Sequence, residues 1–140
     1  MDISPESLAL AEDNAARNNV TRQIQFLPGD GFAALPNGTQ FDLIISNPPY
    51  IPSAEIATLQ PEVRDFDPRG ALDGGSDGLD FYRRLAAQAR PLLKPGGKIM
   101  LEFGDGQADA VRKIFETEKW IVEAVREDYS HRQRILIARF

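Results

Sequence analysis

One four-residue stretch, Asn47-Pro48-Pro49-Tyr50, carries the residue types in this sequence that are best suited to chemistry. It follows the apolar run Phe41–Ile45, and proline cannot donate to a sheet ladder, so a strand must end at Asn47. The stiff loop beyond it offers an amide, two carbonyls without neighbouring N–H donors, and an aromatic ring. The Asn47 side-chain oxygen and the Pro48 carbonyl can each accept one N–H of a planar amide or amino nitrogen, while the ring of Tyr50 packs on the group. This arrangement aims the nitrogen at an electrophile and raises its electron density where positive charge develops.

The alternative for this stretch is a proline-rich strand terminator with no chemical role. Turns rarely need this four-residue order, and proline supplies the stiffness that an active-site loop requires. Open α/β sheets also bind their ligands at the carboxyl ends of strands. We therefore interpret these four residues, Asn47, Pro48, Pro49 and Tyr50, as the catalytic loop.

Two aspartates stand at the ends of other apolar segments. Asp2 lies just before a helix, where a carboxylate can accept both hydroxyls of a ribose. Taken alone, it is better interpreted as a capping carboxylate that stabilises the start of the helix. Asp30 ends the next strand and could accept from an exocyclic amine of a base, with Gly31 or Phe32 against the ring. An ordinary turn aspartate fits Asp30 equally well.

Other polar features favour structural interpretations. His131 is the only histidine, and no nucleophile or ligand set stands near it, so we expect a surface residue and no metal site. Gly104-Asp105-Gly106 lacks the full pattern of a phosphate-binding loop. Arg83, Arg84 and Arg90 could form a local basic face, but a solvated helix face is the simpler interpretation.

The composition is that of a soluble globular domain. The 140 residues are 42% hydrophobic and 26% charged, and no apolar run is long enough to span a bilayer. The absence of cysteine excludes disulfides and thiolate metal sites. A net charge of −5 does not favour a general nucleic-acid-binding surface. These features predict a cytoplasmic protein without a membrane partner.

Apolar spacing and turn residues predict an alternation of strands and helices, which indicates an α/β fold with a parallel, doubly wound sheet. The last two strands are joined by a short polar connection, so we expect them to form an antiparallel hairpin. The long segment 51–77 is rich in proline and glycine, and we expect it to be an irregular loop on the substrate side. In chain order we predict the end of a strand at 1–3, a helix from 5 to 18 or 19, strands at 23–27 and 41–46, a helix at 79–89, a strand at 98–103, a helix after 106, and strands at 120–125 and 134–138.

The motif Asn47–Tyr50 after an apolar strand, with Leu92–Gly97 leading to a later strand, resembles the class I S-adenosylmethionine-dependent methyltransferases. The runs Glu62–Arg64, Ala71–Gly75 and Asp77–Leu79 narrow the resemblance. Together they are similar to the HemK/PrmC family, which methylates the side-chain amide nitrogen of a glutamine in peptide chain release factors. The four-residue motif alone is shared with adenine-N6 DNA methyltransferases and some RNA methyltransferases.

The resemblance implies a Rossmann-like class I methyltransferase sheet and S-adenosyl-L-methionine as the methyl donor. Asp2 would bind its ribose, and Asp30 and Gly31 would lie by its adenine. Family members often have a large aromatic residue where Gly31 stands, so Phe32 would take over the stacking. Asn47, which also borders the cofactor site, would bind the glutamine amide.

In the same family, the Pro48 carbonyl would share the binding of that amide and Tyr50 would pack on it. The methyl group would then pass directly to the amide nitrogen, with a release factor as the protein partner.

The family also has a strand and a Gly-x-Gly-x-Gly loop upstream of the acidic strand end, preceded by a small helical domain. The resemblance therefore implies that residues 1–140 are part of a catalytic domain, truncated at the N-terminus. We expect such a chain to bind the cofactor weakly and to self-associate through exposed strand edges. Two alternatives stay open: a methyltransferase acting on base amino groups of DNA or RNA, and a noncatalytic folding or assembly fragment. The charge and the acidic segment after Tyr50 favour a protein substrate.

Overall fold

In the computed structural model, which describes residues 1–140, the chain forms two units, Met1–Thr39 and Gln40–Phe140. The first unit is built on helix α1 (Pro5–Arg17). The Ser4 hydroxyl oxygen accepts the Ser7 N–H at 3.0 Å, and Pro5 occupies the first turn, where its missing N–H costs nothing. The helix is capped at its carboxyl end by Asn18, and Asn19 follows in the left-handed conformation with φ 57°. The predicted helix and both of its ends are confirmed.

The predicted strand at 23–27 is wrong. The 3₁₀ helix η1 (Thr21–Gln23) occupies its start, and the only strand-like pairing nearby is an isolated parallel bridge between Asp2 and Pro28. The alternation of Ile24 and Phe26 is typical of a strand. A strand, however, forms only where a partner supplies a row of hydrogen bonds, and Ile24 remains 45% exposed.

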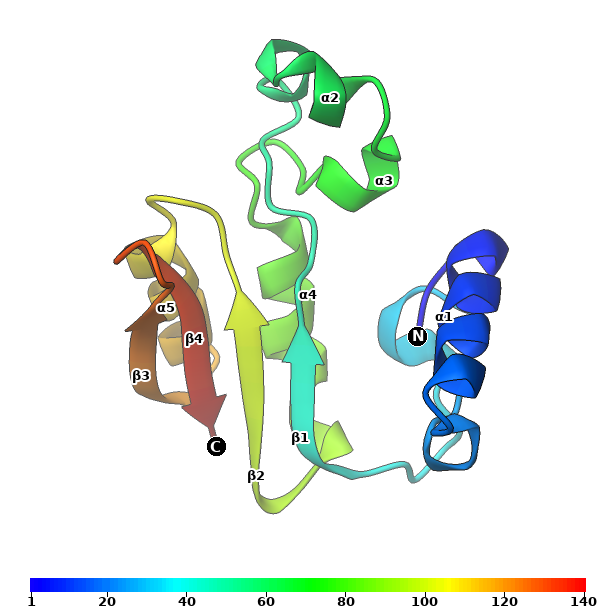
Figure 1. The fold of residues 1–140 in the computed structure, drawn as a ribbon. Helices are drawn as coiled ribbons and strands as arrows, with labels where there is room; N and C mark the ends of the chain where they lie inside the picture. The colour runs from blue at the N-terminus through cyan, green and yellow to red at the C-terminus, as the bar shows by residue number, and fades with distance from the viewer. The chain divides into compact units, whose positions relative to one another are not determined.

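The second unit contains a four-stranded sheet in the order β1-β2-β4-β3, shown in Figure 1. β1 and β2 are parallel, whereas β4 pairs antiparallel with both β2 and β3. The α/β class and the antiparallel terminal hairpin are confirmed, but of the predicted parallel, doubly wound sheet this unit contains a single parallel pair, β1 and β2. The strands are β1 (Phe41–Ser46), β2 (Leu93–Glu102), β3 (Ile121–Glu127) and β4 (Gln133–Arg139).

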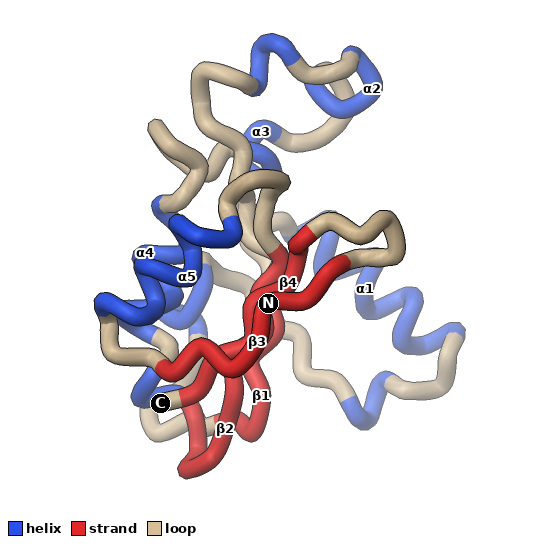
Figure 2. Tube along the Cα trace, turned by 90° about the vertical axis from the view of Figure 1, so that its left-hand side faces the viewer, coloured by secondary structure: helices blue, strands red, loops and turns tan.

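Helices α4 (Asp80–Gln88) and α5 (Ala108–Thr117) lie on one face of this sheet, as Figures 1 and 2 show. The apolar side chains of the sheet that face these helices are buried. Burial of alternate apolar side chains along the strands holds the helices against the sheet. At the edge, the rings of Phe115 and Trp120 meet edge-on at 5.4 Å between centroids. Trp120 also donates its indole N–H to the Ala86 carbonyl at 2.8 Å. Both aromatic residues belong to the buried core of this unit.

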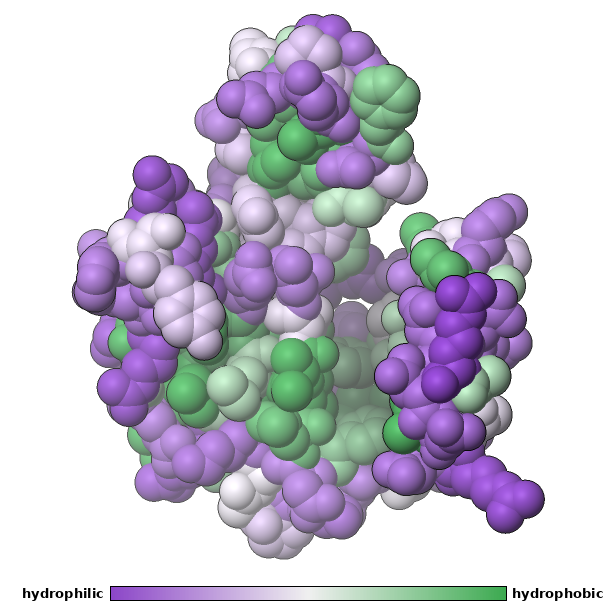
Figure 3. All heavy atoms as spheres, in the orientation of Figure 1, coloured by the Kyte–Doolittle hydropathy of each residue, from purple (hydrophilic) through white to green (hydrophobic).

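The opposite face of the sheet keeps apolar side chains at the surface. Leu43 and Ile45 of β1 are 43% and 72% exposed, and Figure 3 shows apolar residues gathered over the strands in this view. None of the helices is long and apolar enough to cross a membrane.

Strand β2 begins five residues earlier than predicted. After the 3₁₀ helix η4 (Arg90–Leu92), Leu93 already pairs with Phe41, but the next pair joins Lys98 to Leu43. The residues that lie between Leu93 and Lys98 form a bulge without ladder pairs. This bulge lets the chain turn at Pro95-Gly96-Gly97 while the strand continues. The predicted strand at 98–103 therefore missed the pairing of Leu93 with Phe41 that precedes the turn.

The segment 51–77 is more ordered than expected. It contains η3 (Ile56–Thr58) and two one-turn helices, α2 (Pro61–Arg64) and α3 (Arg69–Leu72). Its prolines do not prevent the helices, because Pro61 stands in the first turn of α2 and Pro68 at the N-cap of α3. Figure 1 shows these helices beyond the carboxyl ends of β1 and β2.

Candidate active site

The loop Asn47–Tyr50 lies directly at the carboxyl end of β1. Asn47 is exposed, Pro48 is buried, and Pro49 and Tyr50 are half-buried. No other residue of the chain bonds to the Asn47 side chain, and none donates to the Pro48 carbonyl. The two acceptors that sequence reasoning singled out are therefore available to a ligand.

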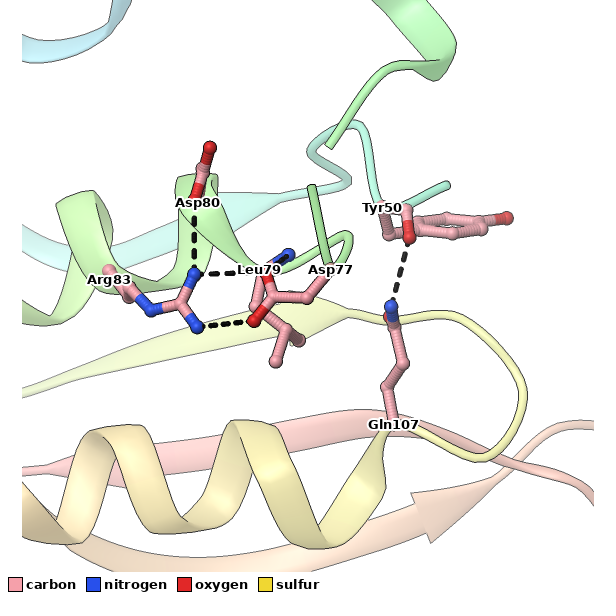
Figure 4. A network of polar contacts seen from close by, with 6 residues as sticks. All are labelled: Tyr50, Asp77, Leu79, Asp80, Arg83 and Gln107. Atoms are coloured by element: carbon pink, nitrogen blue, oxygen red, sulfur yellow. Dashed lines mark hydrogen bonds and ion pairs between the residues drawn. The ribbon is translucent and has the colours of Figure 1, made fainter. Parts of the chain in front are cut away.

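Tyr50 is held through its main chain. The side-chain amide of Gln107 donates from Nε2 to the Tyr50 carbonyl oxygen at 2.9 Å, as Figure 4 shows. The other end of the same amide, Oε1, accepts the Gly104 N–H at 2.9 Å. Gln107 stands just before α5, so a residue far along the sequence connects the loop after β1 to the turn after β2.

Three glycines surround Tyr50 where any larger residue would collide. A Cβ at Gly74 would lie 2.8 Å from the Tyr50 Cα, and one at Gly104 would lie 2.9 Å from Cδ2 of its ring. A Cβ at Gly78 would collide with the Tyr50 carbonyl oxygen, and its φ of 76° also favours glycine. These glycines stand in the sequence motifs Ala71–Gly75, Asp77–Leu79 and Gly104-Asp105-Gly106, from which no role for them was predicted. Their positions next to polar residues at strand and helix ends were the available signal.

The segment after the loop closes on itself at its base. The Ile51 N–H donates to the Leu72 carbonyl at 3.0 Å, and the Gly74 N–H donates to the Ile51 carbonyl at 2.9 Å. A further bond of 2.9 Å runs from the Ser53 N–H to the Gly75 carbonyl. The helices α2 and α3 thus project from a hydrogen-bonded neck that begins at the residue after Tyr50.

Asp73 organises this neck. Its carboxylate accepts from the Ser53 hydroxyl at 2.6 Å and from the Gly75 N–H at 3.0 Å. The Arg69 guanidinium lies 3.2 Å from the other carboxylate oxygen. These donors, the Ser53 hydroxyl first, hold the pKa of Asp73 below its ordinary value, so the carboxylate stays ionised near neutral pH.

Two other polar groups near the loop have structural partners. The buried Tyr82 donates its hydroxyl to the Glu102 carbonyl at 2.9 Å, and burial raises the pKa of this phenol above its ordinary value. Arg83 pairs with Asp77 and Asp80, as Figure 4 shows, and its hydrogen bond lowers the pKa of Asp77. These bonds tie the first turns of α4 to β2 and to Asp77.

Arg83, Arg84 and Arg90 are exposed and do not form the local basic patch that was the less favoured alternative for them. Besides Arg83, the Arg84 guanidinium lies over the Phe81 ring at 5.3 Å, and Arg90 lies over Phe140 at 4.9 Å. His131 is 90% exposed, 3.4 Å from Glu127, which confirms a surface histidine. No group of acidic residues and histidine in the chain is arranged to hold a metal ion.

The predicted cofactor residues of the first unit lie close together. The bridge between Asp2 and Pro28 rests on two bonds, from the Asp2 N–H to the Leu27 carbonyl at 3.3 Å and from the Gly29 N–H to the Asp2 carbonyl at 3.0 Å. Asp2 and Asp30 therefore stand at the same end of two adjacent parallel segments.

The side chains of these residues are placed by local turns. Oδ1 of Asp2 accepts the Ser4 N–H at 2.8 Å, which is a turn around the helix start and not the helix cap itself. Asp30 precedes the 3₁₀ helix η2 (Gly31–Ala34), with Gly31 at φ 56° and Phe32 half-buried.

A family model described as "Methyltransferase domain" matches residues 1–135 of the sequence. The chain belongs to the methyltransferase domain family. A solved structure of a methyltransferase from Pyrococcus furiosus superimposes with a TM-score of 0.69 over 97% of this chain and 58% of its own, at 20% identity. That likeness shows the fold, which agrees with the α/β class predicted from the sequence.

The sequence is similar to release factor glutamine methyltransferases. The protein of that name from Rhodospirillum rubrum is 48% identical over 139 residues, which cover 99% of this chain and 42% of the relative. The one from Geobacter sulfurreducens is 51% identical over 115 residues, covering 82% of this chain and 39% of the relative. The resemblance noted from the motifs is confirmed, and the chain spans less than half the length of these two relatives.

Proposed function

We propose that this methyltransferase-family chain carries the acceptor part of a site that transfers a methyl group to the side-chain amide nitrogen of a glutamine in peptide chain release factors. One observation supports this more than any other: Asn47 and Pro48 present two unpaired acceptors on a loop whose main chain is held at Tyr50. The relatives named for this reaction support the choice of substrate.

The two acceptors match the two N–H groups of a primary amide. The Asn47 side-chain oxygen takes one N–H and the Pro48 carbonyl takes the other, while the Tyr50 ring covers the flat face of the group. An amide nitrogen is a weak nucleophile because its lone pair is delocalised into the carbonyl. Accepting both hydrogens returns electron density to the nitrogen and orients it.

The methyl donor is S-adenosyl-L-methionine, which supplies a methyl group on a sulfonium sulfur. The glutamine nitrogen forms a bond to the methyl carbon as the carbon–sulfur bond breaks, and the cationic nitrogen then loses one N–H proton to water. Until that proton leaves, Asn47 and Pro48 stabilise the positive charge through the hydrogen bonds already formed. The loop performs orientation and electrostatic stabilisation, so no strongly basic side chain is required.

The residues of the first unit fit the nucleoside part of this donor. One carboxylate oxygen of Asp2 is engaged by Ser4, which leaves the other to accept ribose hydroxyls. Asp30 and Gly31 suit the adenine, with Phe32 as the neighbouring ring. The shared end of the two parallel segments supports the assignment of both carboxylates to one nucleoside.

A base amino group of DNA or RNA also presents two N–H groups to such a loop. The segment 51–77 favours a protein instead, because Phe66 is 82% exposed between Asp65 and Asp67. The carboxylates of the segment that follows the acceptor loop along the chain repel a phosphate backbone, and the net charge of −5 adds to this repulsion. An exposed aromatic side chain is typical of protein–protein contacts.

The test is methyl transfer from radiolabelled S-adenosyl-L-methionine by the protein at its full natural length. Peptide chain release factor, the same factor with the labelled glutamine changed to alanine, and duplex DNA are offered as acceptors. We expect label in the unaltered release factor alone, on a glutamine side chain located by mass spectrometry. Label in DNA and none in release factor would contradict the proposal.

A further inference from the structure

We infer that Gln107 is a positioning residue for methyl transfer, which acts by fixing the Tyr50 carbonyl and, through it, the acceptor loop. The inference rests on the proposed function of that loop. Gln107 is half-buried, and its side-chain amide makes the bonds to Tyr50 and Gly104 described above, each at 2.9 Å.

The two bonds leave only one orientation for this amide. The Tyr50 carbonyl needs a donor and the Gly104 N–H needs an acceptor, so Nε2 must face Tyr50 and Oε1 must face Gly104. A carboxylate at this position could satisfy Gly104 but not Tyr50, and a hydrocarbon could satisfy neither. Among side chains of this length, only glutamine provides both partners.

Gln107 is itself fixed by the core. Its main-chain carbonyl accepts the N–H of the fully buried Val111 at 2.9 Å in the first turn of α5. The space around its amide is also restricted, because a Cβ at Gly78 would lie 2.7 Å from Nε2. The amide therefore has little freedom, and the position that it imposes on Tyr50 is well defined.

Because the loop is stiff, the position of the Tyr50 carbonyl also restricts where the acceptor atoms of Asn47 and Pro48 can lie. Between Tyr50 and Asn47 stand two prolines, whose φ angles are locked by their rings. Fixing the Tyr50 carbonyl at one end and strand β1 at the other leaves the Pro48 carbonyl and the Asn47 side chain few alternative placements. A displacement of about 1 Å at a reacting group can cost about 10²-fold in rate.

The variant Gln107→Glu separates the two bonds, since it keeps an acceptor for Gly104 and removes the donor to Tyr50. Gln107→Leu removes both. Asp105→Asn is the matched control, because Asp105 lies in the same turn, is exposed, and bonds to Arg132 at 3.2 Å without contacting Tyr50. All three are made in the full-length protein and assayed with release factor and S-adenosyl-L-methionine.

We expect kcat to fall about 10- to 100-fold in both Gln107 variants, with KM for both substrates within about twofold of wild type. Asp105→Asn should keep kcat within about twofold. A Gln107→Glu protein with wild-type kcat would overturn the inference, because it would show that only the bond to Gly104 matters. A higher KM with unchanged kcat would also overturn it.

Amide hydrogen exchange at Ile51 and Ser53 gives a readout that does not depend on activity. Exchange at these two positions should be faster in Gln107→Glu than in wild type and unchanged in Asp105→Asn. Unchanged exchange in Gln107→Glu would overturn the inference even if kcat falls. If the wild-type protein does not methylate release factor, the proposed function fails, and the exchange comparison alone decides whether Gln107 fixes the loop.

Discussion

A Cβ placed on Gly104 would lie 2.9 Å from Cδ2 of the Tyr50 ring, so this ring packs directly on the main chain of the turn that follows β2. The same Cβ would lie 2.9 Å from Oε1 of Gln107. A methyl group at position 104 therefore displaces both the ring and the amide that holds it.

We expect Gly104→Ala to lower methyl transfer at least about tenfold, because the loop must move by a few tenths of an ångström or more. Overpacking of this kind costs about 1–3 kcal/mol of stability, so the free energy of unfolding is measured beside kcat. Gly70→Ala is the matched control, since a Cβ there meets nothing within 4 Å. Equal activity in the two variants would show that Tyr50 does not need its contact with Gly104.

Asn47→Ala removes one of the two proposed acceptors from an exposed position. Losing one preorganised transition-state contact costs about 10²–10³ in kcat, and we expect a loss of that size. Stability should stay within about 0.5 kcal/mol of wild type, because the side chain bonds to no other residue. Asn37→Ala, in an exposed turn, serves as the control, and kcat within fivefold of wild type in Asn47→Ala would argue against its role.

Phe66→Ala tests the segment 51–77 as a surface for the protein substrate. Phe66 is 82% exposed, so its loss should leave stability and kcat unchanged while KM for release factor rises about five- to tenfold. Tyr129→Ala removes a fully exposed aromatic residue from the β3–β4 turn and should change none of these. The two variants are compared in one titration with release factor, and equal KM values would contradict the role of Phe66.

Trp120→Phe probes the core of the second unit. The change removes the 2.8 Å bond to the Ala86 carbonyl and leaves that buried carbonyl without a partner, at a cost of about 1–3 kcal/mol. Urea denaturation followed by circular dichroism should show the lower midpoint with an unchanged slope. A midpoint equal to that of wild type would mean that the carbonyl finds another donor.

The neck of the segment 51–77 should weaken in acid. The folded state holds the pKa of Asp73 below its unfolded value, so its contribution to stability is present above about pH 4 and is lost as pH falls through the folded-state pKa. Asp73→Asn lacks this titration. The difference in unfolding free energy between wild type and variant should therefore be full at pH 7 and shrink towards pH 3, and a difference that grows on acidification would refute this account.

Part of the fold could be predicted from the sequence, because it depends on interactions between neighbouring residues. Ser4 and Pro5 begin α1, and Phe41–Ser46 forms β1, because capping, ring constraint and apolar runs act over a few neighbouring residues. The loop that follows β1 was recognisable for the same reason, since two prolines after Asn47 end a strand wherever they occur.

Pairings between residues that are distant along the chain could not be predicted from the local sequence. The segment 23–27 has the alternation of a strand but forms only a bridge at Pro28, and Leu93 joins β2 ahead of its predicted start. Whether an extended segment becomes a strand depends on the hydrogen-bonding edge that it meets, which alternation of side chains does not specify.

The sequence by itself determined the α/β class, the end of β1 before Asn47-Pro48-Pro49-Tyr50 and the resemblance to a methyltransferase family. Only the tertiary structure decided that Gln107, 57 positions after Tyr50, donates a hydrogen bond to the Tyr50 carbonyl. It also decided that Gly74, Gly78 and Gly104 leave space for Tyr50. The physical reason is that a hydrogen bond or a close contact depends on distances of a few ångströms. Only folding brings residues that are far apart along the chain within such distances.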